Sequence, residues 1–179
     1  DNPGRTDDHR SSILLRRPKP TLRPLLISHD LSHSGAPIAL LALAKALRRL
    51  GEDPLVVALR GGPLADRFRD AGIEITHRIE PAGISFVIAN TIVAVPAALR
   101  FKRSGVPVAT WLHESEYFFR QYQISPQQQG LSDVDIVLTP SSFQIEQLRP
   151  FLPPRGAYQL RNAVRQPWFR PQGEQSMLA

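Results

Sequence analysis

The sequence predicts an α/β fold, with a doubly wound and mostly parallel β-sheet and helices on both faces. Short apolar segments of strand length alternate with amphipathic segments of helix length from residue 25 onward, and glycine or proline marks most of the boundaries. Strands and helices that alternate in this way form parallel β-α-β units. The 179 residues are enough for one ordinary domain with a single hydrophobic core.

The first predicted unit is a strand, a polar loop and a helix. Residues 25–27 are apolar and bounded by Pro24 and polar residues, which is typical of a short buried strand. A helix is expected to begin near Pro37, since leucines then recur at three- and four-residue spacing. Gly51 is expected to end that helix in a left-handed conformation.

The same pattern continues along the chain. Six further strands are expected, at residues 55–59, 73–76, 86–89, 106–112, 134–138 and 158–160. Helices are expected at residues 64–71, from Pro96 to near Gly105, and from Ser141, which has capping-box spacing to Gln144, to about Arg149. One link is too short for a helical crossover, because only about nine residues separate Thr76 from Phe86. Either the strand at 73–76 is an edge strand that pairs differently, or a helix is missing there.

The net positive charge of the chain limits the kinds of partner that it is expected to bind. The net charge is +6, and residues 1–23 are basic and contain proline, so they are expected to form a flexible leader. The domain is then expected at residues 24–165, and a linker or tail at 166–179. The leader is either a tail of biased composition or a contact for anions such as a lipid surface. Nucleic acid is not an expected partner, because no basic helix with base-reading residues and no RNA-type aromatic motif is present.

The loops that follow the strands are the candidate site, because ligands of such sheets bind beyond the carboxyl ends of the strands. Ser34, Gly35 and Ala36 stand directly before the first helix. Glycine lets a bound group approach the backbone, and the N–H groups of a helix start favour an anion such as phosphate. The alternative is that Gly35 only permits a tight turn. A single glycine does not make a dinucleotide fingerprint.

A second candidate is the segment that follows residues 106–112. His113 can donate a hydrogen bond to a substrate oxygen or exchange a proton, or it can simply be satisfied by neighbouring backbone. Glu114 lies in a first helical turn, where carboxylates are favoured anyway, which weakens the case for a catalytic base. The aromatic residues after it either belong to the core or form a platform for sugar rings or an acyl chain; they are Tyr117, Phe118, Phe119 and Tyr122.

Metal and thiol chemistry are not expected. His29 and His33 have ligand spacing but no third ligand at a readable distance, so we predict no metal site. The sequence has no cysteine, which excludes disulfides, zinc ribbons and thiol nucleophiles. A chain without cysteine suits the reducing cytoplasm, which is the expected location, with the inner face of the membrane as an alternative.

Taken in order, these segments resemble the N-terminal, Rossmann-like domain of a GT-B glycosyltransferase, close to the family-four group of retaining enzymes. The similarity covers roughly residues 24–171. The matching segments are the opening strand and loop through Ser34-Gly35-Ala36, the helix end Leu50-Gly51, Val87-Ile88-Ala89-Asn90, the strand that leads to His113-Glu114, Val134 to Ser142, and Leu160 to Val164, where Ala163 replaces a family glycine.

The resemblance implies roles for these residues. Ser34, Gly35 and Ala36 would approach the donor diphosphate or the acceptor, and His113 would be the catalytic residue near the reacting sugar. Asn90, Glu114 and Ser141 would line the acceptor side. No metal or other cofactor is expected, and the nucleotide sugar serves as co-substrate.

The resemblance also implies a reaction and a missing part. The expected activity is transfer of a sugar from a nucleotide sugar to a glycan or glycolipid, in the biosynthesis of a surface polysaccharide. The donor-binding C-terminal domain of such enzymes has no counterpart in the 179 residues, so the isolated chain is expected to be inactive. The alternative is a non-catalytic α/β binding or scaffolding module. A dehydrogenase or receiver-like domain is disfavoured, since both fingerprints are absent.

Overall fold

The computed structural model describes residues 23–77 and 80–160. Seven strands form one sheet in the order β3-β2-β1-β4-β5-β6-β7, and every neighbouring pair is parallel. The fold class predicted from the sequence is therefore confirmed. The strands are β1 (Pro24–Ser28), β2 (Leu55–Ala58), β3 (Glu74–Thr76), β4 (Phe86–Asn90), β5 (Val108–Trp111), β6 (Ile136–Thr139) and β7 (Ala157–Gln159).

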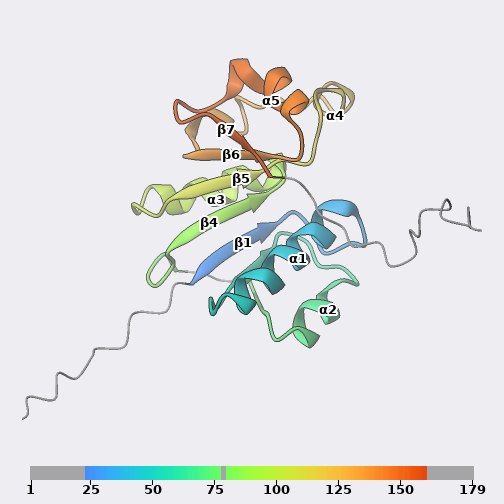
Figure 1. Ribbon diagram of the computed structural model, residues 1–179, viewed down its shortest axis with the longest axis vertical. Helices are drawn as coiled ribbons and strands as arrows, with labels where there is room; N and C mark the ends of the chain where they lie inside the picture. The colour runs from blue at the N-terminus through green and yellow to red at the C-terminus, as the bar shows by residue number, and fades with distance from the viewer. Residues whose placement is uncertain (1–22, 78–79, 161–179) are drawn as a thin grey trace, which may run out of the picture.

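Helices cover both faces of the sheet, as Figure 1 shows, with α1 and α2 in front of it and α3 behind it. The helices are α1 (Gly35–Arg49), α2 (Ala65–Asp70), α3 (Val95–Lys102), α4 (Glu116–Gln121) and α5 (Ser142–Leu148). Short 3₁₀ turns lie at Ile92–Ala94, directly before α3, at Leu131–Asp133 and at Arg149–Phe151. The chain is doubly wound, because α1 and α2 cover one face of the sheet and α3, α4 and α5 cover the other, with the change of face between β3 and β4.

The core is divided by the sheet into two layers, because successive side chains of a strand point to opposite faces. In β1, Leu25 and Ile27 pack on the side of α3, α4 and α5, whereas Leu26 packs on the side of α1 and α2. All five residues of β1 are buried, which is the pattern of a central strand covered on both faces. Because β1 is central, the loop that follows it lies in the middle of the row formed by the carboxyl ends of the strands.

The helix boundaries follow local signals with small shifts. Helix α1 begins at Gly35 rather than at Pro37, because Ser34 already has the extended conformation of an N-cap residue. Gly51 ends α1 with a φ of +86°, as the sequence predicts. At α5, the Oγ of Ser141 accepts a hydrogen bond from the Gln144 N–H at 3.2 Å, so the predicted N-cap is confirmed.

The short link between β3 and β4 contains no helix within its described residues, 77 and 80–85. The strand β3 is an edge strand, as one interpretation proposed, but it pairs parallel to β2 like the others. The chain then crosses to β4 on the far side of β1. A shallow cleft of about 310 Å³ remains over this part of the sheet. It is lined by Ile27, Val57, Leu59, His77, Pro81, Ala97, Arg100 and Phe101.

The ends of the chain carry several predictions that fall outside the described residues. These are the leader up to residue 22, the tail at 166–179 and the Asn162-Ala163 segment. Arg23, the last residue of the predicted leader, is described, and its guanidinium pairs with Asp53 at 3.0 Å and Glu74 at 3.1 Å. Among the helices that the structure describes, none has the length and apolarity to cross a bilayer.

Candidate functional site

A cleft of about 520 Å³ opens at the carboxyl ends of β1, β4 and β5. The register pairs Ser28 with Asn90 and Asn90 with Trp111, so the segments that follow these three strands leave the sheet side by side. The residues that line the cleft are His29, Ser34, Gly35, Ala36, Thr91, Val93, His113, Glu114, Ser115, Tyr117 and Phe118. The volume lies in the range of ligand pockets, about 300–1,000 Å³.

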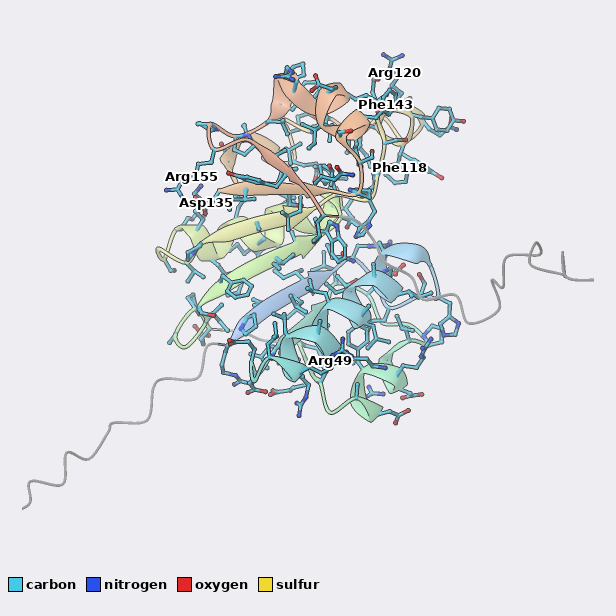
Figure 2. All side chains as sticks on the ribbon, in the orientation of Figure 1. Arg49, Phe118, Arg120, Asp135, Phe143 and Arg155 are labelled. Atoms are coloured by element: carbon cyan, nitrogen blue, oxygen red, sulfur yellow. The ribbon has the colours of Figure 1, made fainter. Side chains whose placement is uncertain are left out.

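In Figure 2 the carboxyl ends of these strands are on the right, near the label of Phe118, and the amino ends are on the left, near the labels of Asp135 and Arg155. The left edge holds a second cavity of about 600 Å³ at the amino ends of β5, β6 and β7. Lys102 lines it and pairs there with Asp135 at 3.0 Å. This larger cavity lies at the amino ends of the strands, where parallel sheets do not bind ligands. The cleft at the carboxyl ends of β1, β4 and β5 is therefore the better candidate for the functional site.

Gly35 forms part of the cleft wall at the start of α1. A Cβ built on Gly35 would meet no described atom within 4 Å, and its φ lies outside the left-handed region. Neither a turn nor close packing within the described chain therefore requires glycine here. The first helical N–H groups belong to Gly35 and Ala36, and the Ser34 side chain makes no capping hydrogen bond within the described part. This helix start is open to a ligand, and its dipole favours an anion.

Asn90, at the end of β4, joins the start of α1 to the segment after β5 through hydrogen bonds beneath the cleft. The side chain is fully buried; its Nδ2 donates to the carbonyl of Ala36, and its Oδ1 lies 2.9 Å from Nε2 of His113. Because only the amide nitrogen can donate to a carbonyl, the oxygen must face the imidazole. An amide oxygen only accepts, so Nε2 of His113 carries a proton. Asn90 thereby fixes the tautomer of His113 and its position relative to α1.

The environment of His113 favours the neutral ring. Burial, together with a smaller contribution from the nearby His29, lowers the pKa of His113 from about 6.5 to about 4. The Trp111 ring lies 4.6 Å from the imidazole, centroid to centroid. At neutral pH, His113 is therefore an uncharged group that can hydrogen-bond a ligand but offers no positive charge to it.

The depressed pKa of His113 predicts a pH dependence of stability. Its folded pKa, about 4, lies below the unfolded value near 6.5, so the unfolded chain binds more protons between these values. The stabilising contribution is present above pH 6.5 and is lost as the pH falls toward 4. In urea unfolding across this range, the wild-type protein should lose more stability than His113→Gln, which keeps an N–H donor facing Asn90. Parallel pH profiles for the two proteins would contradict the neutral buried histidine.

Glu114 lines the cleft, but its carboxylate is occupied by the backbone. One oxygen accepts from the Ile92 N–H and the other from the His113 N–H, each at 3.0 Å. Burial raises the pKa of Glu114, while these backbone donors oppose that rise. Since Ile92 opens the turn that continues into α3, the carboxylate caps that helical segment from the loop after β5. The geometry thus favours a role in holding the cleft wall, and substrate contact by Glu114 stays a prediction.

The predicted site residues come together except for one. Ser34, Gly35, Ala36, His113 and Glu114 line the cleft, and Asn90 lies directly beneath it. Ser141 does not line the cleft, and its hydroxyl is engaged as the N-cap of α5. Helix α5 contacts the site through Gln144, whose side chain donates to the Glu114 carbonyl.

Sequence reasoning missed several residues of the cleft as site residues. His29 was considered only as a metal ligand, and its Nδ1 lies 3.4 Å from the Thr91 hydroxyl. Thr91 has a φ of +125°, a conformation that a β-branched residue rarely adopts, and such strain often lies at functional sites. Both residues follow strands that end at the cleft, so the carboxyl-end rule places them in the candidate loops, but nothing in the sequence singled them out within those loops. Within residues 23–77 and 80–160, no three His, Asp or Glu side chains are grouped as metal ligands.

Two kinds of comparison identify relatives of this fold. Residues 21–147 match the profile of the family described as Glycosyl-transferase family 4. Among solved structures, Alr3699/HepE from Anabaena in complex with UDP-glucose matches with a TM-score of 0.63 and 15% identity, over 80% of this chain and 44% of that protein. A glycosyltransferase from Rickettsia africae matches with a TM-score of 0.55 and 15% identity, also over 80% and 44%.

The scope of these matches differs. The structural matches span less than half of the length of the proteins concerned, and at this identity they show the fold alone. No curated protein matches the sequence significantly. The family profile, in contrast, covers more than half of the chain, including β1 to β6 and the whole of the cleft. The chain therefore belongs to glycosyl-transferase family 4.

Proposed function

We propose that this chain is the acceptor-side, N-terminal half of a hexosyltransferase that takes its sugar from a nucleotide sugar. The acceptor is a glycan or glycolipid of a surface polysaccharide, and the enzyme works at the cytoplasmic side of the membrane. In the transfer, the bond between the anomeric carbon and the diphosphate oxygen breaks and the diphosphate leaves with the electron pair. The acceptor hydroxyl forms the new bond to carbon and loses its proton.

The observation that carries the proposal is the open backbone of Gly35 in the same cleft as His113. A diphosphate placed at the start of α1 would accept hydrogen bonds from the Gly35 and Ala36 N–H groups, and the helix dipole would stabilise its charge. His113 would then face the transferred sugar as a neutral hydrogen-bonding partner. The Anabaena structure, which carries UDP-glucose on a similar fold, supports a nucleotide sugar as donor.

We assign the remaining wall of the active site to a further, donor-binding domain, in keeping with a chain that spans 44% of the Anabaena protein it matches. Among the described residues that line the cleft there is no Lys or Arg to pair with phosphates, so the cleft supplies only part of the contacts that would hold a nucleotide. We therefore expect the chain alone to bind a nucleotide sugar weakly and to catalyse no transfer, because proximity and preorganised charge depend on both walls. No metal is included in the proposed mechanism.

Replacing Gly35 with leucine tests the proposal. The new side chain has room in the fold but would occupy the cleft, so stability should be unchanged while UDP-glucose binding is lost. Amide NMR spectra of the chain titrated with UDP-glucose should show shifts at Gly35, Ala36 and His113, and Gly35→Leu should abolish them.

The matched control is Gly61→Leu, since a Cβ on Gly61 also meets no described atom within 4 Å and Gly61 does not line the cleft. This variant should keep the UDP-glucose shifts. Shifts confined to the opposite cavity, around Lys102 and Arg155, would refute the placement of the donor.

A further inference from the structure

The cleft has one wall of apolar and aromatic side chains that the donor proposal does not use. We call Val93, Tyr117 and Phe118 the aromatic wall; all three line the cleft. Tyr117 is 74% exposed and Val93 is 37% exposed, although both are large apolar side chains beside a cavity. Phe118 is backed by Tyr122, with the two ring centroids 4.6 Å apart. The wall is therefore a supported surface with its outer ring open to a ligand.

Charge is scarce along this cleft. No Lys or Arg occurs among the described residues that line it. The one carboxylate in the lining, Glu114, is bound to backbone N–H groups, and His113 is neutral. The basic residues Lys102, Arg103 and Arg155 gather instead at the cavity on the opposite edge of the sheet. An acidic or phosphorylated group placed on the aromatic wall would lose its hydration without gaining a cationic partner.

Hydroxyl groups surround the wall in place of charges. Ser34, Thr91, Ser115 and the phenol of Tyr117 all contribute to the lining. A hydroxyl both donates and accepts, which matches the hydroxyls of a sugar. Aromatic rings in turn offer an apolar face to the C–H groups of a sugar ring and a polar edge to its oxygens. Aromatic and hydroxyl side chains without charge are the combination that a neutral sugar ring requires.

We propose that the aromatic wall binds the acceptor, and that the acceptor unit bound there is an uncharged sugar ring stacked on Tyr117 and Phe118. This inference rests on the proposed function and deepens it, because it states which acceptors the site accepts. The described lining offers no Lys or Arg to an acidic or phosphorylated sugar, so the wall disfavours such acceptors, while the start of α1 remains the place for the donor diphosphate.

Fluorine NMR on the chain labelled with 3-fluorotyrosine tests this proposal directly. The protein has three tyrosines, so three signals result, and each is assigned by a Tyr→Phe variant. Neutral methyl glycosides of glucose, galactose and mannose are titrated in parallel with methyl glucuronide and glucose 6-phosphate. The signal of Tyr117 should shift with at least one neutral glycoside and with neither charged one. Tyr158, which lies on β7 outside the cleft, is the internal control.

Variants distinguish the loss of ring stacking from a general loss of folded structure. Tyr117→Phe keeps the ring and loses only the phenol, so it should bind the neutral glycoside less than about threefold more weakly than wild type, whereas Tyr117→Ala should bind roughly threefold to tenfold more weakly. Binding by Tyr117→Ala is followed by ligand-observed saturation-transfer NMR. Phe143→Ala removes a ring that is 70% exposed but does not line the cleft, and it should change nothing.

Three outcomes would overturn the proposal. In the first, charged sugars bind as tightly as neutral ones. In the second, only octyl glucoside and no methyl glycoside shifts the Tyr117 signal, which would assign the wall to a lipid chain. The third is a Tyr117→Ala variant with undiminished binding. UDP-glucose shifts at Gly35 and Ala36 are measured on the same sample, so failure of the acceptor proposal is distinguishable from failure of the donor proposal.

Discussion

Replacing Gly62 with alanine is expected to destabilise the protein by about 3 kcal/mol, at the upper end of the effects of overpacking. A Cβ on Gly62 would lie 2.3 Å from both the carbonyl carbon and the oxygen of Leu31 and 2.8 Å from the Ser32 nitrogen. These are backbone atoms, so no side-chain rotation relieves the clash. Leu31 is buried, and its carbonyl accepts a hydrogen bond from the Leu64 N–H at 2.8 Å, so the loop after β1 is held on both sides.

Gly61→Ala is the matched control, because a Cβ on Gly61 meets no described atom within 4 Å. Urea unfolding of the two variants should give a large loss of stability for Gly62→Ala and a change within about 0.5 kcal/mol for Gly61→Ala. The clash also displaces the loop that leads to Ser34 and Gly35, so nucleotide-sugar shifts at α1 should weaken in Gly62→Ala. Equal stability of the two variants would show that the loops at Leu31 and Gly62 are not in close contact.

The second large effect is expected at Asn90. Asn90→Ala removes the side-chain donor to the half-buried Ala36 carbonyl and the acceptor that faces the half-buried His113 Nε2–H, and it empties a fully buried site, which together should cost about 3 kcal/mol of stability. Asn90→Asp removes the donor to Ala36 and places a carboxylate against the imidazole. It should raise the pKa of His113 from its value of about 4 by roughly one to three units, because an adjacent negative charge favours the imidazolium.

Both Asn90 variants are measured by NMR titration of the His113 ring and by urea unfolding. Thr110→Val is the control, since Thr110 is equally buried in the sheet and donates only to the Ala89 carbonyl. It should leave the pKa of His113 unchanged and cost about 1 kcal/mol, the net worth of one hydrogen bond. A pKa near 4 in Asn90→Asp, or an Nδ1–H tautomer in the wild type by nitrogen chemical shifts, would disprove the role assigned to Asn90.

Much of the candidate site was predictable from the sequence, because the loops that follow parallel strands all lie at the carboxyl end of the sheet. Once the segments ending at Ile27, Ala89 and Leu112 are recognised as parallel strands, the loops that follow them must lie together at the carboxyl end of the sheet. This reasoning brought Gly35 and His113 into one cleft. It did not separate Ser141 from the others, because every strand of the sheet ends at that edge and only the strand order tells which ends are neighbours. The strand β6, which precedes Ser141, is separated from β4 by β5.

Other properties of the site depend on contacts between residues distant in sequence. The occupation of the Glu114 carboxylate by Ile92, and the orientation of the Asn90 amide by Ala36, join segments more than twenty residues apart. The exposure of Tyr117 beside the burial of Phe119 depends on how α4 is rotated against the sheet. Periodicity within a six-residue helix is too short to define that rotation.

The sequence alone determined the alternation of strands and helices, the helix end at Gly51, the cap at Ser141 and the parallel sheet, since these depend on local propensity and on burial patterns within a few residues. Tertiary structure decided the strand order, the crossover from β3 to β4 without a described helix, the tautomer of His113 and the uncharged lining of the cleft. The physical reason is the separation along the chain of the residues that interact. Backbone conformation responds to neighbours along the chain, whereas hydrogen-bond partners, burial and pKa values respond to neighbours in space, which exist only once the sheet has formed.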